Sequence, residues 1–170
     1  MLKLAYLGES KNLNIEKNIL KLLIVRRPVG KIPKGFIHVP QLSPSNNLFE
    51  KTQNWKAKKF NKEELEILKL KDVFSVDENS WWYLYEDAFM LELQNRKDMI
   101  KAVKRLKERL LKGEDIYLFC YCKDVCSCHR GLIGKYIEKD GFEVDYRRIE
   151  KSKENIETER QLSLFNFQQY

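Results

Sequence analysis

The sequence contains no apolar run long enough to span a membrane and no recognisable signal peptide. Its longest apolar stretch, from Ile19 to Val25, is interrupted by Lys21, whereas a membrane-spanning helix needs about 20 apolar residues. We therefore expect an intracellular, cytoplasmic protein with no membrane partner. Thiols stay reduced in that compartment, so the four cysteines indicate metal ligands, catalytic groups or buried thiols rather than a disulfide framework.

Two cysteine spacings with well-known chemistry are also missing. The paired Cys-x-x-Cys spacing of zinc ribbons does not occur, which argues against a structural zinc site. The phosphatase loop Cys-x5-Arg is absent as well, because the residue six positions before Arg130 is Asp124. This absence excludes the best-known route by which a cysteine and an arginine together transfer a phosphoryl group.

The composition that is present describes one soluble domain with a basic surface. The chain has 170 residues, of which 43% are hydrophobic and 34% charged, and its formal net charge is +7. Such a charge favours an acidic partner, nucleic acid first, although a lysine-rich surface can also serve only solubility. The composition predicts an α/β domain over residues 1–149, followed by a polar linker and a tail over residues 150–170.

The chain is organised around the stretch from Ile116 to Ile137, which holds all four cysteines and one of the two histidines. Ile116 to Tyr121 is an apolar and aromatic run typical of a buried strand. From Cys128 onwards, apolar residues recur at helical spacing. The order strand, turn, helix puts the polar turn at the carboxyl end of a strand, where open α/β sheets bind ligands.

The rest of the chain repeats this alternation. It predicts strands over 2–7, 22–25 and 142–148, helices over 15–20, 63–70, 81–93 and 97–112, and a long ordered loop over 28–44. The inner stripe of the last of these helices is predicted to be Ile100, Val103, Leu106 and Leu110. We therefore expect a three-layer, Rossmann-like α/β domain with a mainly parallel sheet.

Three interpretations of the cysteine cluster follow from its residues. In the first, Cys120 or Cys128 is a thiolate of low pKa, stabilised by the helix N-terminus and Arg130, with His129 as acid and base. In the second, a zinc ion or an iron–sulfur cluster is held by Cys120, Cys122, Cys126 and Cys128, with or without His129. In the third, the cysteines are small buried hydrophobes and Arg130 binds an anion.

Cys120 at a strand end, followed by Cys128-His129-Arg130 at a helix start, resembles the signature of family 488 of the domains of unknown function. The loop segments 33–36 and 42–45 are similar to the N-terminal half of that family, in which Arg26 or Arg27 would be the arginine near a strand end. The resemblance implies a fold and a site but no established reaction. Cys122, where relatives usually carry a polar residue such as glutamate, and the additional Cys126 depart from the pattern.

Two further features bear on an anionic ligand. His38 lies between two apolar residues in the predicted loop, and we include it with Arg26 and Arg27 as a candidate anion-binding residue, although loop histidines often have structural roles. The segment 51–62, which has no acidic residues, could clamp a phosphate backbone and stack a base. Alternatively, it is a solvated loop whose aromatic residues dock on the core. Its candidate residues are Lys51, Trp55, Lys56, Lys58, Lys59 and Lys62.

The C-terminal segment carries the most specific binding motif. Gln161-Leu-Ser-Leu164-Phe165 resembles the pentapeptide with which bacterial replication proteins bind the DNA sliding clamp. Gln161, Leu164 and Phe167 also resemble the archaeal and eukaryotic clamp-binding box. The alternative is a tail that folds back onto its own domain. From the tail and the Cys/His/Arg site together we expect a DNA replication or repair accessory protein that acts on nucleic acid or a nucleotide, or else a non-catalytic modulator of the clamp.

Overall fold

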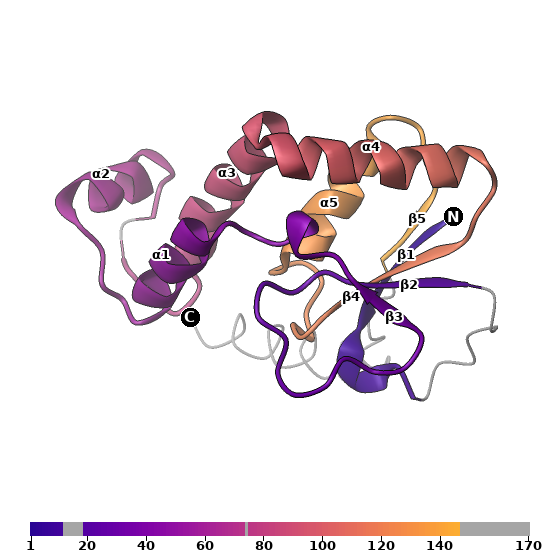
Figure 1. The fold of residues 1–170 in the computed structure, drawn as a ribbon. Helices are drawn as coiled ribbons and strands as arrows, with labels where there is room; N and C mark the ends of the chain where they lie inside the picture. Colours follow the sequence, from indigo (N-terminus) through magenta and orange to yellow (C-terminus); the bar gives the residue numbers. More distant parts are fainter. Residues whose placement is uncertain (12–18, 74, 147–170) are drawn as a thin grey trace, which may run out of the picture.

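The computed structural model describes residues 1–11, 19–73 and 75–146. Their centre is a five-stranded sheet in the order β3-β2-β4-β1-β5, and every pairing in it is parallel. The strands are β1 (Leu2–Tyr6), β2 (Leu20–Leu23), β3 (Phe36–His38), β4 (Ile116–Cys120) and β5 (Val144–Asp145) (Figure 1). The predicted α/β fold with a parallel sheet is therefore confirmed.

Strand β4 occupies the middle of the sheet because all five of its side chains are apolar and buried. Ile116 pairs with Leu2 of β1 on one side and with Leu20 of β2 on the other. A strand that is covered on both faces shows a continuous hydrophobic run rather than an alternating one, and Ile116 to Cys120 has this pattern. Its last residue, Cys120, therefore emerges at the centre of the carboxyl edge of the sheet.

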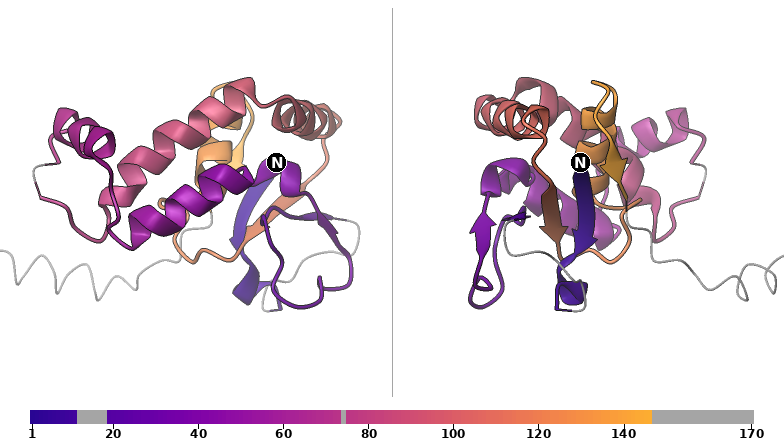
Figure 2. Two further views of the ribbon diagram at one scale, coloured as in Figure 1. Left: turned by 60° about the vertical axis from the view of Figure 1, so that its left-hand side comes forward. Right: turned by 90° about the vertical axis from the view of Figure 1, so that its right-hand side faces the viewer.

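Seven helical segments accompany the strands among the described residues. They are η1 (Leu7–Glu9), η2 (Pro40–Leu42), α1 (Asn46–Lys56), α2 (Lys62–Leu70), α3 (Ser80–Asn95), α4 (Lys97–Leu111) and α5 (His129–Glu138). Helix α1 begins where the Ser45 hydroxyl accepts the Leu48 N–H, and α2 begins with a capping box between Asn61 and Glu64. Figure 2 shows that α1 and α3 run side by side and carry α2 at their far end, away from the sheet.

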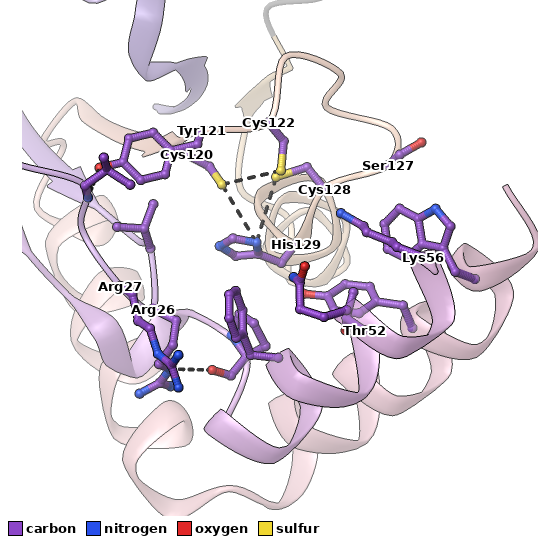
Figure 3. Close-up of a pocket in the computed structure, with 17 residues that line it drawn as sticks. Arg26, Arg27, Thr52, Lys56, Cys120, Tyr121, Cys122, Ser127, Cys128 and His129 are labelled. Carbon is purple, nitrogen blue, oxygen red and sulfur yellow. Dashed lines mark hydrogen bonds between the residues drawn. The ribbon is translucent and has the colours of Figure 1, made fainter. Parts of the chain in front are cut away.

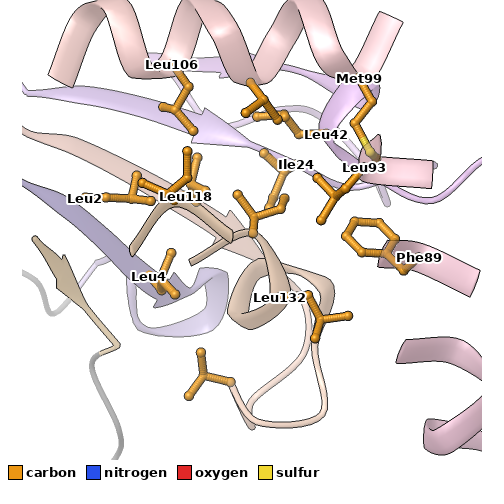
Figure 4. Close-up of a cluster of buried hydrophobic side chains, with 14 of the residues drawn as sticks. Leu2, Leu4, Ile24, Leu42, Phe89, Leu93, Met99, Leu106, Leu118 and Leu132 are labelled. Atoms are coloured by element: carbon orange, nitrogen blue, oxygen red, sulfur yellow. The ribbon is translucent and has the colours of Figure 1, made fainter. Parts of the chain in front are cut away.

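Helices α3, α4 and α5 cover one face of the sheet. On that face, side chains of the strands, such as Leu4 and Leu118, join Phe89 of α3, Leu106 of α4 and Leu132 of α5 in one core (Figure 4). The opposite face has a smaller cluster of buried side chains.

That smaller cluster is completed by Leu7 and Ile19, which belong to the connection from β1 to β2. The neighbouring strands β1 and β4 thus send their following segments to opposite faces of the sheet. Such a switch opens a crevice at the carboxyl ends of the strands, which is where open α/β sheets bind ligands.

Several boundaries differ from the sequence-based expectation. The segment 28–44 is not only loop, because it contains β3 and η2, and residues 46–56, over which no helix was predicted, form α1. In α4 the buried stripe uses Met99, while Ile100 is 43% exposed. The hydrophobic period alone could not separate these two adjacent residues, because the packing of α4 against η2 and α3 sets the rotation of the helix.

Three predictions fall partly or wholly outside the described residues. These are most of the helix over 15–20, the end of the strand over 142–148, and the linker and tail over 150–170. Within the described part of the chain, none of the helices combines the length and the apolar character that a membrane crossing would require.

Candidate functional site

A cavity of about 270 Å³ lies at the carboxyl edge of the sheet. Its walls come from the segment after β2, from helices α1 and α3, and from the turn between β4 and α5 (Figure 3). The sulfur-bearing end comprises Cys120, Cys122, Cys128 and His129. The stretch that the sequence singled out therefore faces a real cavity.

The turn between β4 and α5 is held by side chains within it. The Asp124 carboxylate accepts the backbone N–H groups of Cys126 at 2.9 Å and Ser127 at 3.2 Å. Gly131 lets the helix approach the turn, because a Cβ at this position would lie 2.2 Å from the backbone oxygen of Val125. This close packing brings the start of α5 back against the end of β4.

His129 is oriented by the backbone that follows β2. Its Nε2 donates a hydrogen bond to the carbonyl oxygen of Ile24 at 2.6 Å. Ile24 follows directly after β2, and its own N–H donates to the carbonyl oxygen of Phe119 in β4. Because Nε2 is committed to this carbonyl, Nδ1 is the ring nitrogen left to face the cysteines.

The sulfur atoms gather around that nitrogen. Nδ1 of His129 lies 4.0 Å from the Sγ of Cys120 and 3.9 Å from the Sγ of Cys128. The Sγ of Cys122 lies 3.8 Å from that of Cys120. Cys120 therefore contacts both a second thiol and the imidazole, and it forms part of the cavity wall.

These contacts separate the pKa values of the three thiols. The S–H groups of Cys122 and Cys128, together with the charge of His129, hold the pKa of Cys120 well below its ordinary value despite burial. The hydrogen bond to Cys120 raises the pKa of Cys122 to about 11. Burial raises the pKa of Cys128 well above its ordinary value, and the neighbouring cysteines add to this effect. The arrangement stabilises one thiolate, on Cys120.

The imidazole responds to the same thiolate. Burial by itself would lower the pKa of His129, but the charge and hydrogen bond of Cys120 raise it, and the net direction is upward. Cys120 and His129 therefore favour a thiolate–imidazolium pair. Cys128, the other candidate thiolate, is only 1% exposed, and burial raises its pKa instead of lowering it.

Arg130 has a different position from the one expected of an anion-binding residue. Its side chain is 1% exposed and donates to the carbonyl oxygens of Cys122 at 2.5 Å and Lys123 at 2.9 Å. It does not line the cavity, and its Nε has no hydrogen-bond partner in the described part of the chain. In this structure Arg130 holds the turn that carries Cys122, and it positions the site from behind.

Of the other three predicted anion-binding residues, two line the cavity and one does not. Arg26 lines the cavity, but its Nε donates to the carbonyl oxygen of Pro44 at 2.6 Å. Arg27 also lines the cavity and lies over the Phe49 ring, while its long contact to Glu50 is 3.5 Å. His38 is not among the lining residues, and its Nε2 lies 2.8 Å from the carbonyl oxygen of Val25.

The basic segment 51–62 contributes one residue to the cavity wall among its candidates. The Lys56 ammonium lies 4.3 Å from the centre of the Trp81 ring and belongs to the wall of the cavity. Trp55 is only 5% exposed and belongs to the core, so its ring has no free face on which a base could stack. The remaining lysines are exposed on α1, after it and at the start of α2: Lys51, Lys58, Lys59 and Lys62.

The sequence predicted the helix over 81–93 but not the part that its aromatic residues have in the site. Trp81 and Tyr85 line the cavity. Ring contacts of 5.7, 5.7 and 5.6 Å connect Trp81 to Tyr85, Tyr85 to Phe89 and Phe89 to His129. The spacing of four residues was the available signal, because it places all three rings on one helix face.

A metal ion is a second chemical possibility for the same residues. The ligand atoms of Cys120, Cys128 and His129 all lie within 4.8 Å of one another. Two thiolates and one imidazole form a donor set that zinc accepts in catalytic sites. The Cys122 sulfur contacts that of Cys120 but is not one of the three ligand atoms that lie together. Cys126 is exposed and stands outside this donor set.

The fold and the site together define a class: Rossmann-like α/β proteins with a cysteine and a histidine at the carboxyl edge of a parallel sheet. Residues 6–141 match the family model described as the active DUF488-N3 subclade, and the chain belongs to this family. The resemblance seen at the Cys-His-Arg motif is thereby confirmed. No curated protein and no solved structure matches the chain.

Proposed function

We propose that this protein is a thiol-dependent enzyme that acts on nucleic acid or a nucleotide, with Cys120 as nucleophile and His129 as acid and base. The observation that carries the proposal is the contact of the Cys120 sulfur with Nδ1 of His129 and with Cys122 at the wall of a cavity. A thiolate of lowered pKa beside an imidazolium is the arrangement that activates a cysteine for attack.

The chemistry runs as a double displacement. The Cys120 thiolate attacks an electrophilic atom of the substrate, and the leaving group departs with a proton from Nδ1 of His129. The neutral imidazole then takes a proton from a water molecule, whose oxygen releases the product from sulfur. The thiolate and the imidazolium are both regenerated, so no external redox partner is required.

The walls of the cavity support a nucleotide as the substrate. Trp81, Tyr85 and Phe49 offer aromatic surface for a planar base. Arg27 and Lys56 approach His129 from opposite sides in Figure 3 and supply positive charge for phosphate. An apolar cavity with a few charged groups at its margin is typical of ligand sites.

The C-terminal motif supports recruitment to DNA. In this proposal Gln161, Leu164 and Phe165 bind the sliding clamp, with Phe167 as a further anchor for an archaeal clamp. A few buried anchors can supply most of the affinity of such an interface. The motif lies more than ten residues after Tyr146, the last residue the structure describes, so the clamp and the substrate would occupy different parts of the chain.

Covalent trapping tests the enzymatic part of the proposal. The protein would be incubated with single-stranded, double-stranded and nicked oligonucleotides and with mononucleotides, then quenched in acid and analysed by intact mass. We expect an adduct on Cys120 that is absent from Cys120→Ser and retained by Cys126→Ser, which removes an exposed cysteine outside the cluster. If no adduct forms and Cys120→Ser processes every substrate as the wild type does, the nucleophile is not Cys120.

Two alternatives rest on separate observations. The convergence of Cys120, Cys128 and His129 favours a zinc enzyme. Elemental analysis of the purified protein tests this alternative. One equivalent of zinc in the wild type that is lost in Cys128→Ser would replace the thiolate mechanism.

The clamp motif alone favours a non-catalytic modulator of the clamp. Such a modulator would keep its effect on clamp-dependent DNA synthesis in Cys120→Ser and lose it when the tail is removed.

A further inference from the structure

A second thiol lies against the Cys120 sulfur at the margin of the cavity. The two Sγ atoms of Cys120 and Cys122 are 3.8 Å apart, and both residues line the cavity. Cys128 lines the cavity as well, but Cys122 is half-buried, whereas Cys120 and Cys128 are only 3% and 1% exposed. A peroxide that reaches Cys120 through the cavity therefore meets Cys122 on the same wall.

We propose that Cys120 and Cys122 are an oxidative modification site, at which a hydroperoxide converts the two thiols into a reversible disulfide that switches the site off. This inference rests on the proposed function in one respect, that Cys120 is the reactive thiolate. It adds a role for Cys122. At this position the family pattern that the chain resembles usually has a polar residue.

The oxidation balances in two steps. The Cys120 thiolate attacks one peroxide oxygen, the O–O bond breaks, and the leaving hydroxide or alkoxide takes a proton from solvent, which leaves a sulfenic acid. The Cys122 sulfur then attacks the sulfenic sulfur, the S–O bond breaks, and the hydroxide leaves as water with the Cys122 proton. The two cysteines lose two electrons and the hydroperoxide gains them.

The backbone geometry permits this bond. Two residues of extended chain span about 6.6 Å, which lies inside the Cα separation of about 4.4–6.8 Å that disulfides adopt. The chain bends at Tyr121, between the two cysteines. The sulfurs need only close from 3.8 Å to about 2.05 Å. Arg130 keeps Cys122 beside its partner by holding the Cys122 carbonyl oxygen.

The other two cysteines are less suited to the reaction. Cys128 caps the start of α5, and its approach to Cys120 would draw the first turn of that helix with it. Cys126 is exposed and held in the turn by Asp124, outside the cluster of ligand atoms. Cys122 lies after the strand and before the turn, where the backbone has the freedom to adjust.

Peptide mapping tests the proposal directly. The reduced, full-length protein would be treated with one equivalent of hydrogen peroxide, alkylated in acid and digested with trypsin without reduction. Cleavage after Lys112 and Lys123 isolates residues 113–123, which contain Cys120 and Cys122 but neither of the other cysteines. In the oxidised sample we expect this peptide to carry no alkyl group and to be two hydrogens lighter than its free dithiol form, and to gain those two hydrogens after dithiothreitol.

Variants make the outcome decisive. Cys126→Ser should form the same disulfide, whereas Cys122→Ser should accumulate sulfenic and then sulfinic acid on Cys120. After oxidation, the Cys120 alkylation rate that dithiothreitol restores should be at least tenfold lower in Cys122→Ser than in the wild type. A peptide 113–123 cross-linked to residues 124–130, which contain Cys126 and Cys128, would assign a different partner to Cys120 and overturn the proposal. Equal over-oxidation of wild type and Cys122→Ser would also overturn it.

The alkylation rate of the reduced protein separates this inference from the proposed function. Fast alkylation of Cys120 without disulfide formation would remove only the modification site. Slow alkylation together with a normal disulfide would remove Cys120 as the activated nucleophile but leave the disulfide established.

Discussion

Nε2 of His129 lies 2.6 Å from the carbonyl oxygen of Ile24, a residue 105 positions earlier in the chain. This one contact determines which ring nitrogen faces the cysteines, and it links the end of β2 to the start of α5. Because Ile24 also donates its N–H to β4, the histidine and the nucleophile candidate Cys120 are positioned by the same part of the sheet. The chemistry of the site depends on this arrangement.

The first prediction concerns the pH dependence of Cys120. A thiol whose pKa is lowered remains ionised as the pH falls, so the iodoacetamide alkylation rate of Cys120 should stay high well below about 8.5, the ordinary cysteine pKa. His129→Gln removes the positive charge and should move the midpoint upward. The rates would be measured by mass spectrometry in a Cys126→Ser background. A midpoint near that of a free thiol in both proteins would contradict the thiolate–imidazolium pair.

The second prediction concerns Arg130. Arg130→Ala should lower the free energy of unfolding by about 2–5 kcal/mol, because it removes a side chain that is 1% exposed, opens a void and leaves the carbonyl oxygens of Cys122 and Lys123 without their donor. Urea denaturation measures this change. Arg130→Lys, which keeps a donor and part of the volume, should lose less.

Phosphate binding separates this structural role from the expected anion-binding one. Inorganic phosphate should bind Arg130→Lys and the wild type alike, because Arg130 does not line the cavity. A loss of phosphate affinity without a loss of stability would restore Arg130 to the anion site.

The third prediction uses two glycines of α5 as a matched pair. At Gly131 an added Cβ would meet the backbone oxygen of Val125 at 2.2 Å, whereas at Gly134 it would first meet the end of the Leu4 side chain at 2.7 Å. Backbone cannot move aside as a side chain can. Gly131→Ala should therefore cost about 1–3 kcal/mol of unfolding free energy and slow Cys120 alkylation, while Gly134→Ala should cost less and leave the alkylation rate unchanged. Equal effects of the two substitutions would mean that the turn is not closely packed.

The fourth prediction concerns the lysines of α1. Lys56→Gln should weaken binding of single-stranded DNA and reduce the slope of log affinity against log salt by about 0.7, because Lys56 lies at the cavity wall. Lys51→Gln, an exposed lysine on the same helix that does not line the cavity, is the control. Fluorescence anisotropy at several salt concentrations gives both slopes. Identical slopes for Lys56→Gln and Lys51→Gln would show that the DNA phosphates do not bind preferentially at the cavity.

The fifth prediction concerns the C-terminal motif. A peptide of residues 160–170 should bind the host sliding clamp, and Leu164→Ala or Phe165→Ala in the whole protein should cost about 2 kcal/mol, or about thirtyfold in affinity. Isothermal titration calorimetry measures both.

The two aromatic anchors identify the clamp type. Phe165→Ala should be the more damaging change for a bacterial clamp and Phe167→Ala for an archaeal one, because each clamp type relies on a different aromatic residue. A clamp that ignores both the peptide and the protein would remove the link to replication and leave the catalytic proposal standing.

Local sequence pattern determined the elements that carry the site. The run from Ile116 to Tyr121 and the helical spacing after Cys128 correspond to β4 and α5 within one residue at the ends they share with the turn. The helices predicted over 63–70, 81–93 and 97–112 correspond to α2, α3 and α4 within two residues at each end. These features are local, because hydrophobic period and turn residues act over a few positions.

Tertiary structure alone decided which thiol is the thiolate. The sequence left Cys120 and Cys128 as equivalent candidates, and the choice depends on burial and on the contact of the Cys120 sulfur with His129, which forms only when β4 and α5 pack together. It likewise decided that Arg130 holds carbonyl groups instead of a ligand, and that Trp81 and Tyr85 line the cavity. Desolvation and electrostatic interaction depend on distances between residues far apart in the chain, such as Ile24 and His129, and the order of amino acids does not contain those distances until the sheet has formed.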